Sequence, residues 1–422
     1  MAQRVAPTNP PLTPPLFMDI DFYRKLGLYF HLEPIEQTLP NGRVIVTGHG
    51  TMIMLGGYSY LGLIGHPKID AAAKAAVDRY GTGTHGVRLL AGTLPLHDEL
   101  EARIARFKQA ENAVTFSSGY VANVSTISSL LRRGDVVLSD KRNHASIVDG
   151  CRLAQGRFLR FRHDDLEHLE YRLHQVAPGT RVLVVVDAVF SMDGDVVDLP
   201  EVSRLCREHG AYLMVDEAHS LGVLGETGHG IEEHFGMEPE TIDIKMGTLS
   251  KAIPSAGGYI AGSRELVEFV RHEARGFVFS AALPPPSAGA ALAALDVIEA
   301  EPERVQALRR NARHLAARLR DAGFALPATP TAIMPIVCGS TDRAARLAHY
   351  CRERGVFVQA IVSPVVPKGT ERLRVCVSAA HTVPDLDHCA EAIIAGARRV
   401  GGVLEAQLGL SSASGAGHPP GA

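Results

Sequence analysis

The sequence lacks the patterns that mark membrane-spanning, disulfide-bonded and nucleic-acid-binding proteins. No uninterrupted apolar run is long enough to cross a bilayer. The six cysteines are scattered and include no CxxC pair, so they indicate neither a metal site nor a disulfide framework. A net charge of −3 gives the whole chain no attraction to nucleic acid or to an anionic membrane. Prolines fill residues 7–15, where a secretory signal would need an apolar core, so we expect a reducing, cytoplasmic setting.

The length of the chain predicts more than one domain. A sequence of 422 residues is too long for one simple core and suggests a large and a small domain. Strand-like apolar runs alternate with helical segments, which is typical of the layered α/β class. We place an N-terminal arm and hairpin at residues 1–55, a large domain at 56–295, a small domain at 296–408 and a disordered tail rich in Ser, Gly, Ala and Pro at 409–422.

An acidic residue and a lysine follow two of the expected strands. Asp216 ends the apolar run of residues 211–215, and Lys251 stands in a loop of small residues after the run at 242–246. Loops at such strand ends are where open α/β sheets bind ligands. An acid that pairs with a pyridinium nitrogen and a lysine that binds an aldehyde covalently are the protein groups that pyridoxal 5′-phosphate (PLP) requires. Taken singly, the lysine would usually be solvated and the aspartate a helix cap.

A Ser-Ser-Gly turn offers a place for the phosphate of that cofactor. It follows a short strand at residues 113–116 and precedes an expected helix. Backbone N–H groups and the positive end of the helix dipole would both face a bound anion there. We therefore assign Ser118, Gly119 and Tyr120 to a phosphate cradle. On these residues alone, a simple helix cap is the more common interpretation.

Longer stretches around these residues resemble one enzyme family. The segments DEAHSLGVLGETGHG (216–230) and GTLSKA (247–252) are similar to the α-oxoamine synthases, PLP enzymes that condense an amino acid with an acyl thioester. The resemblance extends over residues 55–381. It implies the fold-type-I PLP-dependent transferase fold, an α/β fold with a large domain of mostly parallel sheet and a smaller α+β C-terminal domain. It also implies a homodimer with shared active sites.

The resemblance assigns catalytic roles to four residues. Lys251 would bind PLP and act as the base for the α proton of the substrate, and Asp216 would keep the ring nitrogen protonated. His144, in the motif HASI, would stack on the ring and assist proton transfer. His219 would position the ring and its oxygen.

Further residues are assigned to binding on the same grounds. Tyr58 stands where many family members carry Asn, and Arg374 is preferred to Arg372 by motif position as the partner of the substrate carboxylate. A guanidinium suits that role because it can form two parallel hydrogen bonds to a carboxylate. Additional cofactor contacts would come from Ser191, Thr248, Ser250 and, across the subunit boundary, Ser280.

Local motifs favour one branch of the family. Tyr58, the GTLSK motif, HASIVDGC and FRH at residues 161–163 resemble serine palmitoyltransferases. We therefore expect a decarboxylative Claisen-type condensation of L-serine with a long-chain acyl-CoA, which gives a 3-keto sphingoid base and CO2. Because that product is a lipid, peripheral membrane contact stays open.

Other functions remain open. Within the family, alanine or glycine could replace serine, as in 8-amino-7-oxononanoate synthase or 2-amino-3-ketobutyrate ligase, and a carrier-protein thioester could replace the CoA thioester. Outside it, an aminotransferase could use the same fold. A noncatalytic scaffold subunit is disfavoured because the chain retains Lys251.

Arginines are frequent in the expected helices between residues 292 and 319. Nothing aromatic is interleaved with them. A solvent-exposed helix face explains them better than a nucleic-acid interface.

Overall fold

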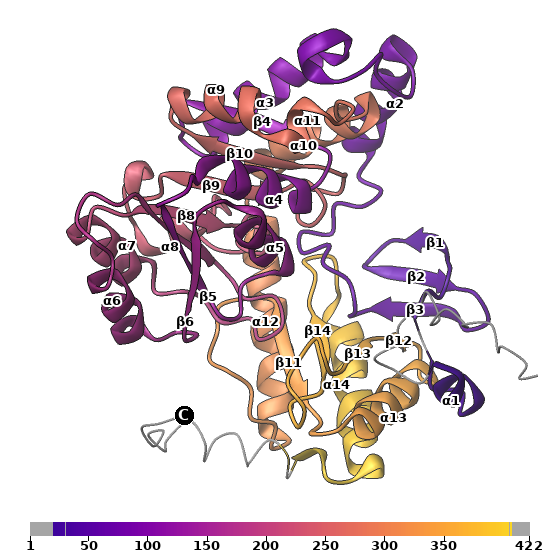
Figure 1. Cartoon of the computed structure of the whole chain (residues 1–422). Helices are drawn as coiled ribbons and strands as arrows, with labels where there is room; N and C mark the ends of the chain where they lie inside the picture. Colours follow the sequence, from indigo (N-terminus) through magenta and orange to yellow (C-terminus); the bar gives the residue numbers. More distant parts are fainter. Residues whose placement is uncertain (1–19, 30, 405, 407–422) are drawn as a thin grey trace, which may run out of the picture.

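The computed structural model describes residues 20–29, 31–404 and 406. The predicted tail at 409–422 and the proline-rich stretch at 7–15 lie outside the described residues. Helices and strands alternate along most of the chain (Figure 1). The α-helices are α1 (Ile20–Lys25), α2 (Pro67–Tyr80), α3 (Pro95–Phe107), α4 (Gly119–Leu130), α5 (Ala145–Leu153), α6 (Leu166–His174), α7 (Leu199–Glu208), α8 (Ile231–Phe235), α9 (Arg264–Glu273), α10 (Arg275–Val278), α11 (Pro285–Ala300), α12 (Glu303–Asp321), α13 (Thr341–Arg352) and α14 (Val383–Val400).

Three sheets contain the strands of the described chain. The strands are β1 (Ile35–Leu39), β2 (Arg43–Val46), β3 (Gly50–Met54), β4 (Asn112–Phe116), β5 (Val136–Asp140), β6 (Arg157–Phe161), β7 (Val182–Asp187), β8 (Tyr212–Asp216), β9 (Ile244–Thr248), β10 (Gly258–Gly262), β11 (Ile333–Val337), β12 (Val356–Phe357), β13 (Gln359–Ile361) and β14 (Arg372–Cys376). Among the residues so described, no helix is both long and apolar enough to span a membrane.

The large domain is built on a seven-stranded sheet with the order β4-β10-β9-β8-β7-β5-β6. The pairs from β9 to β6 are parallel. Strand β10 runs antiparallel to both of its neighbours, β4 and β9. The prediction of a mostly parallel sheet is confirmed.

Both faces of this sheet are covered by helices, so its central strands are apolar throughout. In β7, Val182, Val184 and Val186 belong to one buried cluster, whereas Leu183 and Val185 belong to the other. This alternation follows from the two-residue period of a strand. The first cluster includes residues of α3, α6, α7 and α11, and the second includes residues of α4, α5, α9 and α10 (Figure 1).

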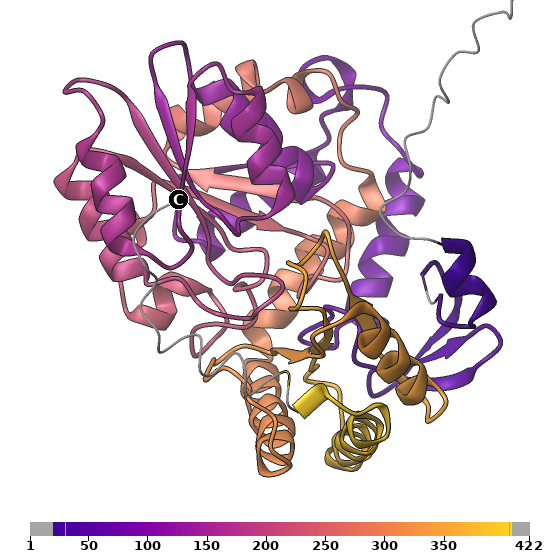
Figure 2. The same cartoon turned by 60° about the horizontal axis from the view of Figure 1, so that its bottom comes forward.

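The small domain contains the antiparallel sheet β11-β14-β13 and the helices α12, α13 and α14. Strands β2 and β3 form the expected N-terminal hairpin. Strand β1 pairs antiparallel with β2, and β12 pairs in parallel with β3. The N-terminal hairpin therefore lies beside the C-terminal part of the chain (Figures 1 and 2). The domain boundaries at residues 55, 295 and 408 stay predictions.

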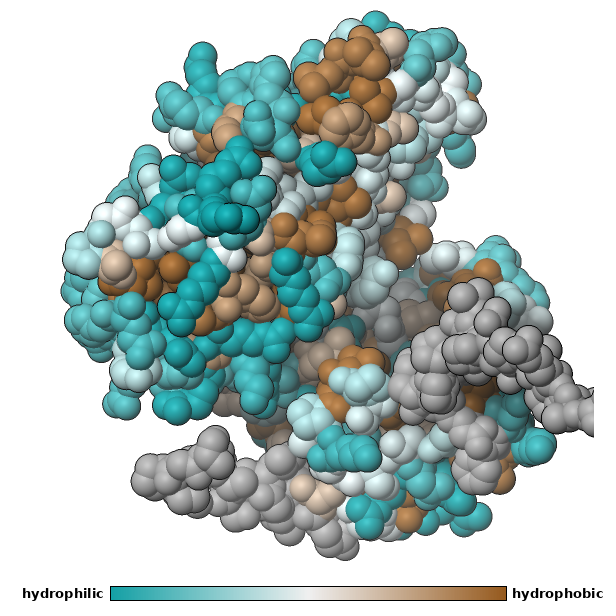
Figure 3. Space-filling view, viewed as in Figure 1, coloured by the Kyte–Doolittle hydropathy of each residue, from teal (hydrophilic) through white to brown (hydrophobic). Residues whose placement is uncertain are grey.

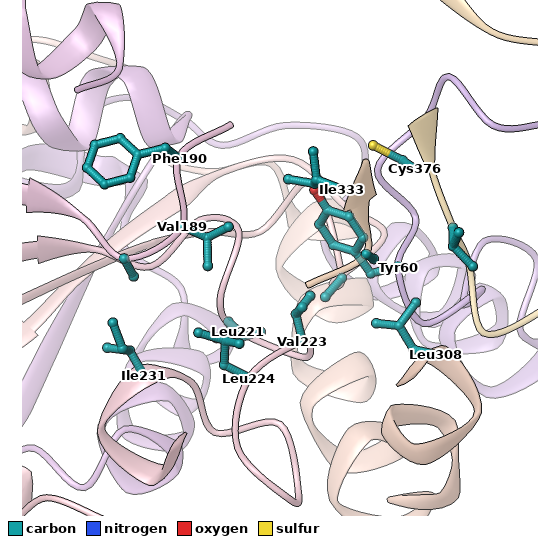
Figure 4. Packing of buried hydrophobic residues seen from close by; sticks show 14 of the residues in the cluster. Tyr60, Val189, Phe190, Leu221, Val223, Leu224, Ile231, Leu308, Ile333 and Cys376 are labelled. Atoms are coloured by element: carbon teal, nitrogen blue, oxygen red, sulfur yellow. The ribbon is translucent and has the colours of Figure 1, made fainter. Parts of the chain in front are cut away.

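A continuous apolar core connects the sheet to the small domain. Figure 4 shows Tyr60, Val223, Leu308 and Ile333 within one cluster. Tyr60 and Val223 come from two different loops, Leu308 comes from α12 and Ile333 from β11. Tight packing of this kind limits how far the loops at the strand ends can move.

Helix α3 carries charged and polar residues on its buried face. The helix buries His97, Glu101 and Arg103 together with its apolar residues. The buried charges are paired, since Glu101 contacts Arg88 at 2.7 Å and Arg103 contacts Glu299 on α11 at 2.6 Å. Ion pairing is what allows charged residues to occupy buried positions.

His381 connects the N-terminal hairpin to the small domain and gives a pH-dependent prediction. A Cβ atom at Gly42 would lie 2.6 Å from its ring, so the imidazole fills the space beside that glycine. Burial lowers the pKa of His381 from 6.5 to about 4, and Asp385 offsets this only in part. Between these two values the unfolded chain binds a proton that the folded chain does not. Stability is therefore full above about pH 6.5 and falls as the pH drops, by up to about 3 kcal/mol near pH 4.

Urea unfolding between pH 7 and pH 4 measures this loss. The substitution His381→Asn should reduce the pH dependence of the unfolding free energy, whereas His272→Asn, at an exposed position on α9, should leave it unchanged. An equal pH dependence in His381→Asn and in the wild type would contradict the assignment.

Candidate active site

Several polar side chains gather where the parallel strands end. Strands β5, β7 and β8 end at Asp140, Asp187 and Asp216, and β9 ends at Thr248. Because these strands are parallel neighbours, their carboxyl ends lie at one edge of the sheet. The lysine loop leaves from the same edge, so the predicted acid and lysine are brought together.

Asp216 is buried and fixed by two hydrogen bonds. Asn123 Nδ2 donates to Oδ2 at 2.7 Å, and the Ala218 N–H donates to Oδ1 at 2.9 Å. Asp187 lies opposite Asp216 in the β7–β8 register and is also buried. Burial, and next the charge of Asp216, raises the pKa of Asp187 well above its ordinary value.

This carboxylate pair fits a cationic ring nitrogen. No arginine or lysine forms a salt bridge with Asp187 or Asp216 within the described part of the chain. Two buried carboxylates so close together are stabilised by a positive group beside them. A protonated pyridine nitrogen supplies that charge, so the residues present fit PLP.

His219 connects Lys251 to a buried tyrosine. Its Nε2 lies 3.0 Å from Lys251 Nζ, and its Nδ1 lies 2.6 Å from the Tyr60 hydroxyl. Burial, and next the charge of Lys251, lowers the pKa of His219 well below its usual range, so the imidazole is neutral near pH 7. Burial likewise lowers the pKa of Lys251, with Asp216 opposing this effect. A lysine with a lowered pKa is a stronger base and nucleophile at neutral pH.

The residues predicted to cradle a phosphate lie at the start of α4. Ser118 caps this helix by accepting a hydrogen bond from the Val121 N–H at 3.1 Å. The first N–H groups of a helix have no intrahelical partner and point out of its N-terminus. A Cβ atom at Gly119 would lie 3.1 Å from Thr248 Oγ1, so glycine allows β9 to approach closely. Thr248 Oγ1 in turn lies 2.8 Å from Ser250 Oγ.

His144 is anchored beside the carboxylate pair. Its backbone N–H donates to Asp187 Oδ2 at 3.0 Å, and its Nδ1 lies 2.7 Å from Ser146 Oγ. Protein atoms packed around the ring lower the pKa of His144, and Asp216 partly reverses this. The residue is exposed in the single chain, so its ring is accessible to a cofactor.

The two arginines of β14 have different partners. Arg372 is held by Asp193 at 2.5 Å and by the Met192 carbonyl at 3.2 Å. Arg374 donates through Nε to the Ser191 carbonyl at 2.5 Å and also contacts the Tyr60 hydroxyl. Arg372 is thus already neutralised by a carboxylate, whereas Arg374 has no acidic partner among the salt bridges of the described residues.

A pocket of about 610 Å³ opens next to these groups. Its lining includes Lys251, Ser250 and Tyr58. Strands β2, β3 and β12 contribute apolar residues to its wall, namely Val44, Met54 and Phe357. The pocket joins the lysine to a surface on which the apolar part of a substrate can lie.

Two predicted cofactor contacts are less direct. The Tyr120 hydroxyl donates to Asp149 at 2.5 Å, so only the backbone of Tyr120 remains for the phosphate. Ser280 lies between α10 and α11, where the neighbouring Ala281 bridges to Val87. Within the described chain, no hydrogen bond joins Ser280 to Lys251. The role of Ser280 in the site of a partner subunit stays a prediction.

Three site residues were not selected from the sequence. Tyr60 and Asn123 hold His219 and Asp216, and Asp187 holds the backbone of His144. Asn123 follows Gly119 by four residues, one helical turn, and is a polar residue on the buried face of α4. A polar residue on the side of an expected helix that faces the sheet usually has a buried hydrogen-bond partner, and this pattern could have identified Asn123 from the sequence.

Comparison with known proteins places this arrangement in a family. Residues 50–393 match the model described as Aminotransferase class I and II. The chain is 46% identical over 361 residues to 8-amino-7-oxononanoate synthase of Anaeromyxobacter dehalogenans, a match that covers 86% of this chain and 90% of the relative. It is 41% identical over 378 residues to the 8-amino-7-oxononanoate synthase of Thermoanaerobacter pseudethanolicus, a match that covers 87% of this chain and 95% of the relative.

Solved structures agree with the sequence relatives. A serine palmitoyltransferase from S. paucimobilis with a bound PLP-myriocin aldimine superposes with a TM-score of 0.87 at 33% identity, covering 90% of this chain and 96% of that one. The chain belongs to the α-oxoamine synthases, within the class I and II aminotransferases.

Membership confirms the predicted family, fold and cofactor. This α-oxoamine synthase is a PLP-dependent enzyme. The roles assigned to its acid, its lysine and the N-terminus of α4 stay predictions. The prediction of serine as the amino acid is not confirmed, because the sequence relatives named above are 8-amino-7-oxononanoate synthases.

Proposed function

We propose that this α-oxoamine synthase forms 8-amino-7-oxononanoate. The observation that supports this best is the 46% identity over 361 residues with a synthase of that name. The product name defines the substrates. The amino-bearing carbon and its methyl group correspond to alanine without its carboxylate, and the rest corresponds to a seven-carbon acyl group that ends in a carboxylate. The reaction joins the α carbon of alanine to the acyl carbon, and it releases CO2 and the thiol.

Each step draws on a group at the strand ends. PLP, when bound, supplies an electron sink for the negative charge at the α carbon. Lys251 removes the α proton, and its lowered pKa suits this role near neutral pH. Neutral His219, 3.0 Å away, orients the amine and is itself held by Tyr60. Asp216 balances the charge of the ring nitrogen, and Arg374 aligns the carboxylate of the amino acid.

The acyl part is proposed to occupy the 610 Å³ pocket beside Lys251. Arg43 on β2 also lines this pocket, and its side chain is 44% exposed although it pairs with Asp385. An arginine at the wall favours an acyl group with a terminal carboxylate over a plain hydrocarbon tail. Either a CoA or a carrier-protein thioester is compatible with this pocket.

Serine palmitoyltransferase activity is the second candidate. The TM-score of 0.87 with the S. paucimobilis enzyme exceeds the 0.72 found with 8-amino-7-oxononanoate synthase from Francisella tularensis, which is 25% identical. Tyr58 at the pocket wall also resembles that branch. In this case the product would be a 3-keto sphingoid base.

We also propose a homodimer in which Ser280 contributes to the site of the partner. The bridge between Val87 and Ala281 brings two segments with exposed apolar residues together, and these residues are Leu89, Leu90 and Phe279. Much of the face in Figure 3 is hydrophilic, and its largest hydrophobic patch lies at the top, near where Figure 1 draws α2 and α11. Exposed apolar patches of this kind favour association. The cytoplasmic location stays a prediction.

Amino-acid titration of the PLP-loaded enzyme tests the substrate assignment. Alanine, serine, glycine and threonine are added separately, and the absorbance of the bound cofactor is followed. We expect saturation by alanine at a concentration at least about tenfold below that for serine, since a pocket shaped for a methyl group discriminates by roughly this factor.

Product mass analysis with acyl thioesters completes this test. A carboxylate-ended seven-carbon thioester and a long-chain acyl-CoA are compared, with the Lys251→Ala variant as the inactive control. Preference for serine and the long chain would replace the proposal by its second candidate. Transfer of an amino group to a keto acid without release of CO2 would indicate an aminotransferase instead.

A further inference from the structure

A second pocket, of about 320 Å³, lies between α8, α12 and the chain that leads into β11. It shares no lining residue with the pocket beside Lys251. Helix α12 runs along the lower part of the molecule with β11 next to it (Figure 1), and His234 of α8 lines the pocket together with residues of α12. The pocket is therefore a separate feature that the proposed reaction does not use.

The charged residues of this pocket are all basic. Arg309, Arg313, Arg320 and His234 line it, and its lining contains no aspartate or glutamate. Arg309 and Arg313 are one helical turn apart on α12, so their side chains lie on the same face. The charge of this pocket is therefore unbalanced.

Two other arginines of α12 are paired with acidic residues, unlike those that line the pocket. Arg304 pairs with Glu301 at 2.7 Å, and Arg318 pairs with Asp387 at 2.6 Å. In the part of the chain that the structure describes, no salt bridge involves Arg309 or Arg313. The arginines that face the pocket thus differ from those that face α14 and the preceding loop.

Arg309 also has an unused buried donor. One of its Nη atoms donates to the Gly225 carbonyl, whereas its Nε is buried without a hydrogen-bond partner. A buried N–H of a charged group is costly when it is left unpaired. Burial, and next the charge of Arg309, lowers the pKa of His234, as expected where no anion compensates the cations.

We infer that this pocket binds a phosphate-bearing anion. The planar guanidinium groups of Arg309 and Arg313 match the oxygens of a phosphate, which would accept from the N–H groups that these side chains present to the pocket. A volume of about 320 Å³ exceeds that of inorganic phosphate and admits a small phosphate ester.

The pocket contacts two loops of the candidate active site. Arg309 holds the Gly225 carbonyl in the loop that follows β8 and carries His219. Thr331, on the pocket wall, donates to the Gly194 carbonyl at 2.8 Å in the loop that follows β7 and carries Ser191. An anion bound here would stabilise the wall that supports both loops.

Thermal unfolding of the PLP-loaded enzyme with inorganic phosphate tests this inference. Saturation with PLP keeps free phosphate out of the cofactor's own phosphate cradle. Potassium chloride at the same ionic strength serves as the reference, because it screens charges without binding as a phosphate does. We expect phosphate to raise the unfolding temperature in a saturable way and chloride to give no comparable rise.

Two matched variants locate the effect. Arg313→Gln removes an exposed positive charge that lines the pocket. Arg310→Gln removes a positive charge of α12 that is also exposed but does not line the pocket. The first should weaken phosphate binding at least about tenfold, the usual loss for a charge-assisted hydrogen bond, and the second should not. Equal responses of all three proteins, or equal effects of chloride and phosphate on the wild type, would overturn the inference. The readout is binding, so the outcome is independent of the proposed reaction.

Discussion

Replacing Lys251 with alanine is expected to lower turnover by at least about a thousandfold, because the general base is lost. The side chain is buried beside His219 at 3.0 Å, so no other lysine of the chain takes its position. The variant should also lose covalently bound PLP. Noncovalent binding should persist, because Asp216 and the N-terminus of α4 remain in place. Turnover and the absorbance of the covalently bound cofactor are the two measurements.

Lys141→Ala provides the matched control for this experiment. Lys141 directly follows β5, at the same edge of the sheet, but its side chain is exposed. Its loss should change neither turnover nor the cofactor spectrum. Near-normal turnover in Lys251→Ala would remove the lysine from the mechanism, even though the family assignment would stand.

Much of the fold was predictable because it depends on short-range patterns. The apolar run at 211–215 predicted a strand that leads to Asp216, and β8 is buried from Leu213 to Asp216. The acid at the end of β8 and the lysine after β9 were expected to meet because parallel strands share an edge. The antiparallel insertion of β10 was not expected, because the sequence does not encode strand order locally.

The supporting contacts of the site were not predictable from the sequence alone. Tyr60 and His219 are separated by 159 positions, and Asn123 and Asp216 by 93. Each contact depends on how the loops pack against the sheet, and no local pattern carries that information. The ion pair of Arg103 on α3 depends on packing in the same way, since its partner Glu299 is 196 positions away on α11.

The preference for serine came from a few short motifs. Tyr58 is one residue at the wall of a pocket with 26 lining residues, so it defines little of the substrate's surroundings. The 41% to 46% identity with 8-amino-7-oxononanoate synthases extends over most of the chain and so includes many more positions than these motifs. Specificity depends on the whole pocket, whereas the motifs around Asp216 and Lys251 serve chemistry that the branches share.

The alternation of side chains along β14 could not show whether Arg372 or Arg374 binds the substrate carboxylate. Residues two apart on a strand point to the same face, so the pattern of β14 places both side chains on one side. Their partners separate them, because Asp193 neutralises Arg372, whereas Arg374 contacts the Ser191 carbonyl, the Tyr60 hydroxyl and the Cys376 thiol and forms no salt bridge in the described chain.

Arg374→Ala is accordingly expected to weaken amino-acid binding by about a hundredfold or more. The variant removes a desolvated guanidinium, and a buried charge-assisted pair contributes on the order of 2–5 kcal/mol to binding. Arg374 is only 8% exposed, so solvent screens it little. The concentration of amino acid that half-saturates the cofactor's spectral change is the measurement. The KM of the acyl thioester should change much less, which separates carboxylate binding from a general loss of the site.

Arg372→Ala distinguishes this role from a structural one. That variant breaks the ion pair with Asp193 and should lower the unfolding temperature, but it should leave amino-acid affinity within a few-fold of the wild type. Arg374→Lys should recover part of the affinity, because an ammonium keeps the charge but loses the two parallel hydrogen bonds. If Arg372→Ala instead raised the half-saturating concentration and Arg374→Ala did not, the carboxylate partner would be Arg372. The ion pair with Asp193 would then have to open when the substrate binds.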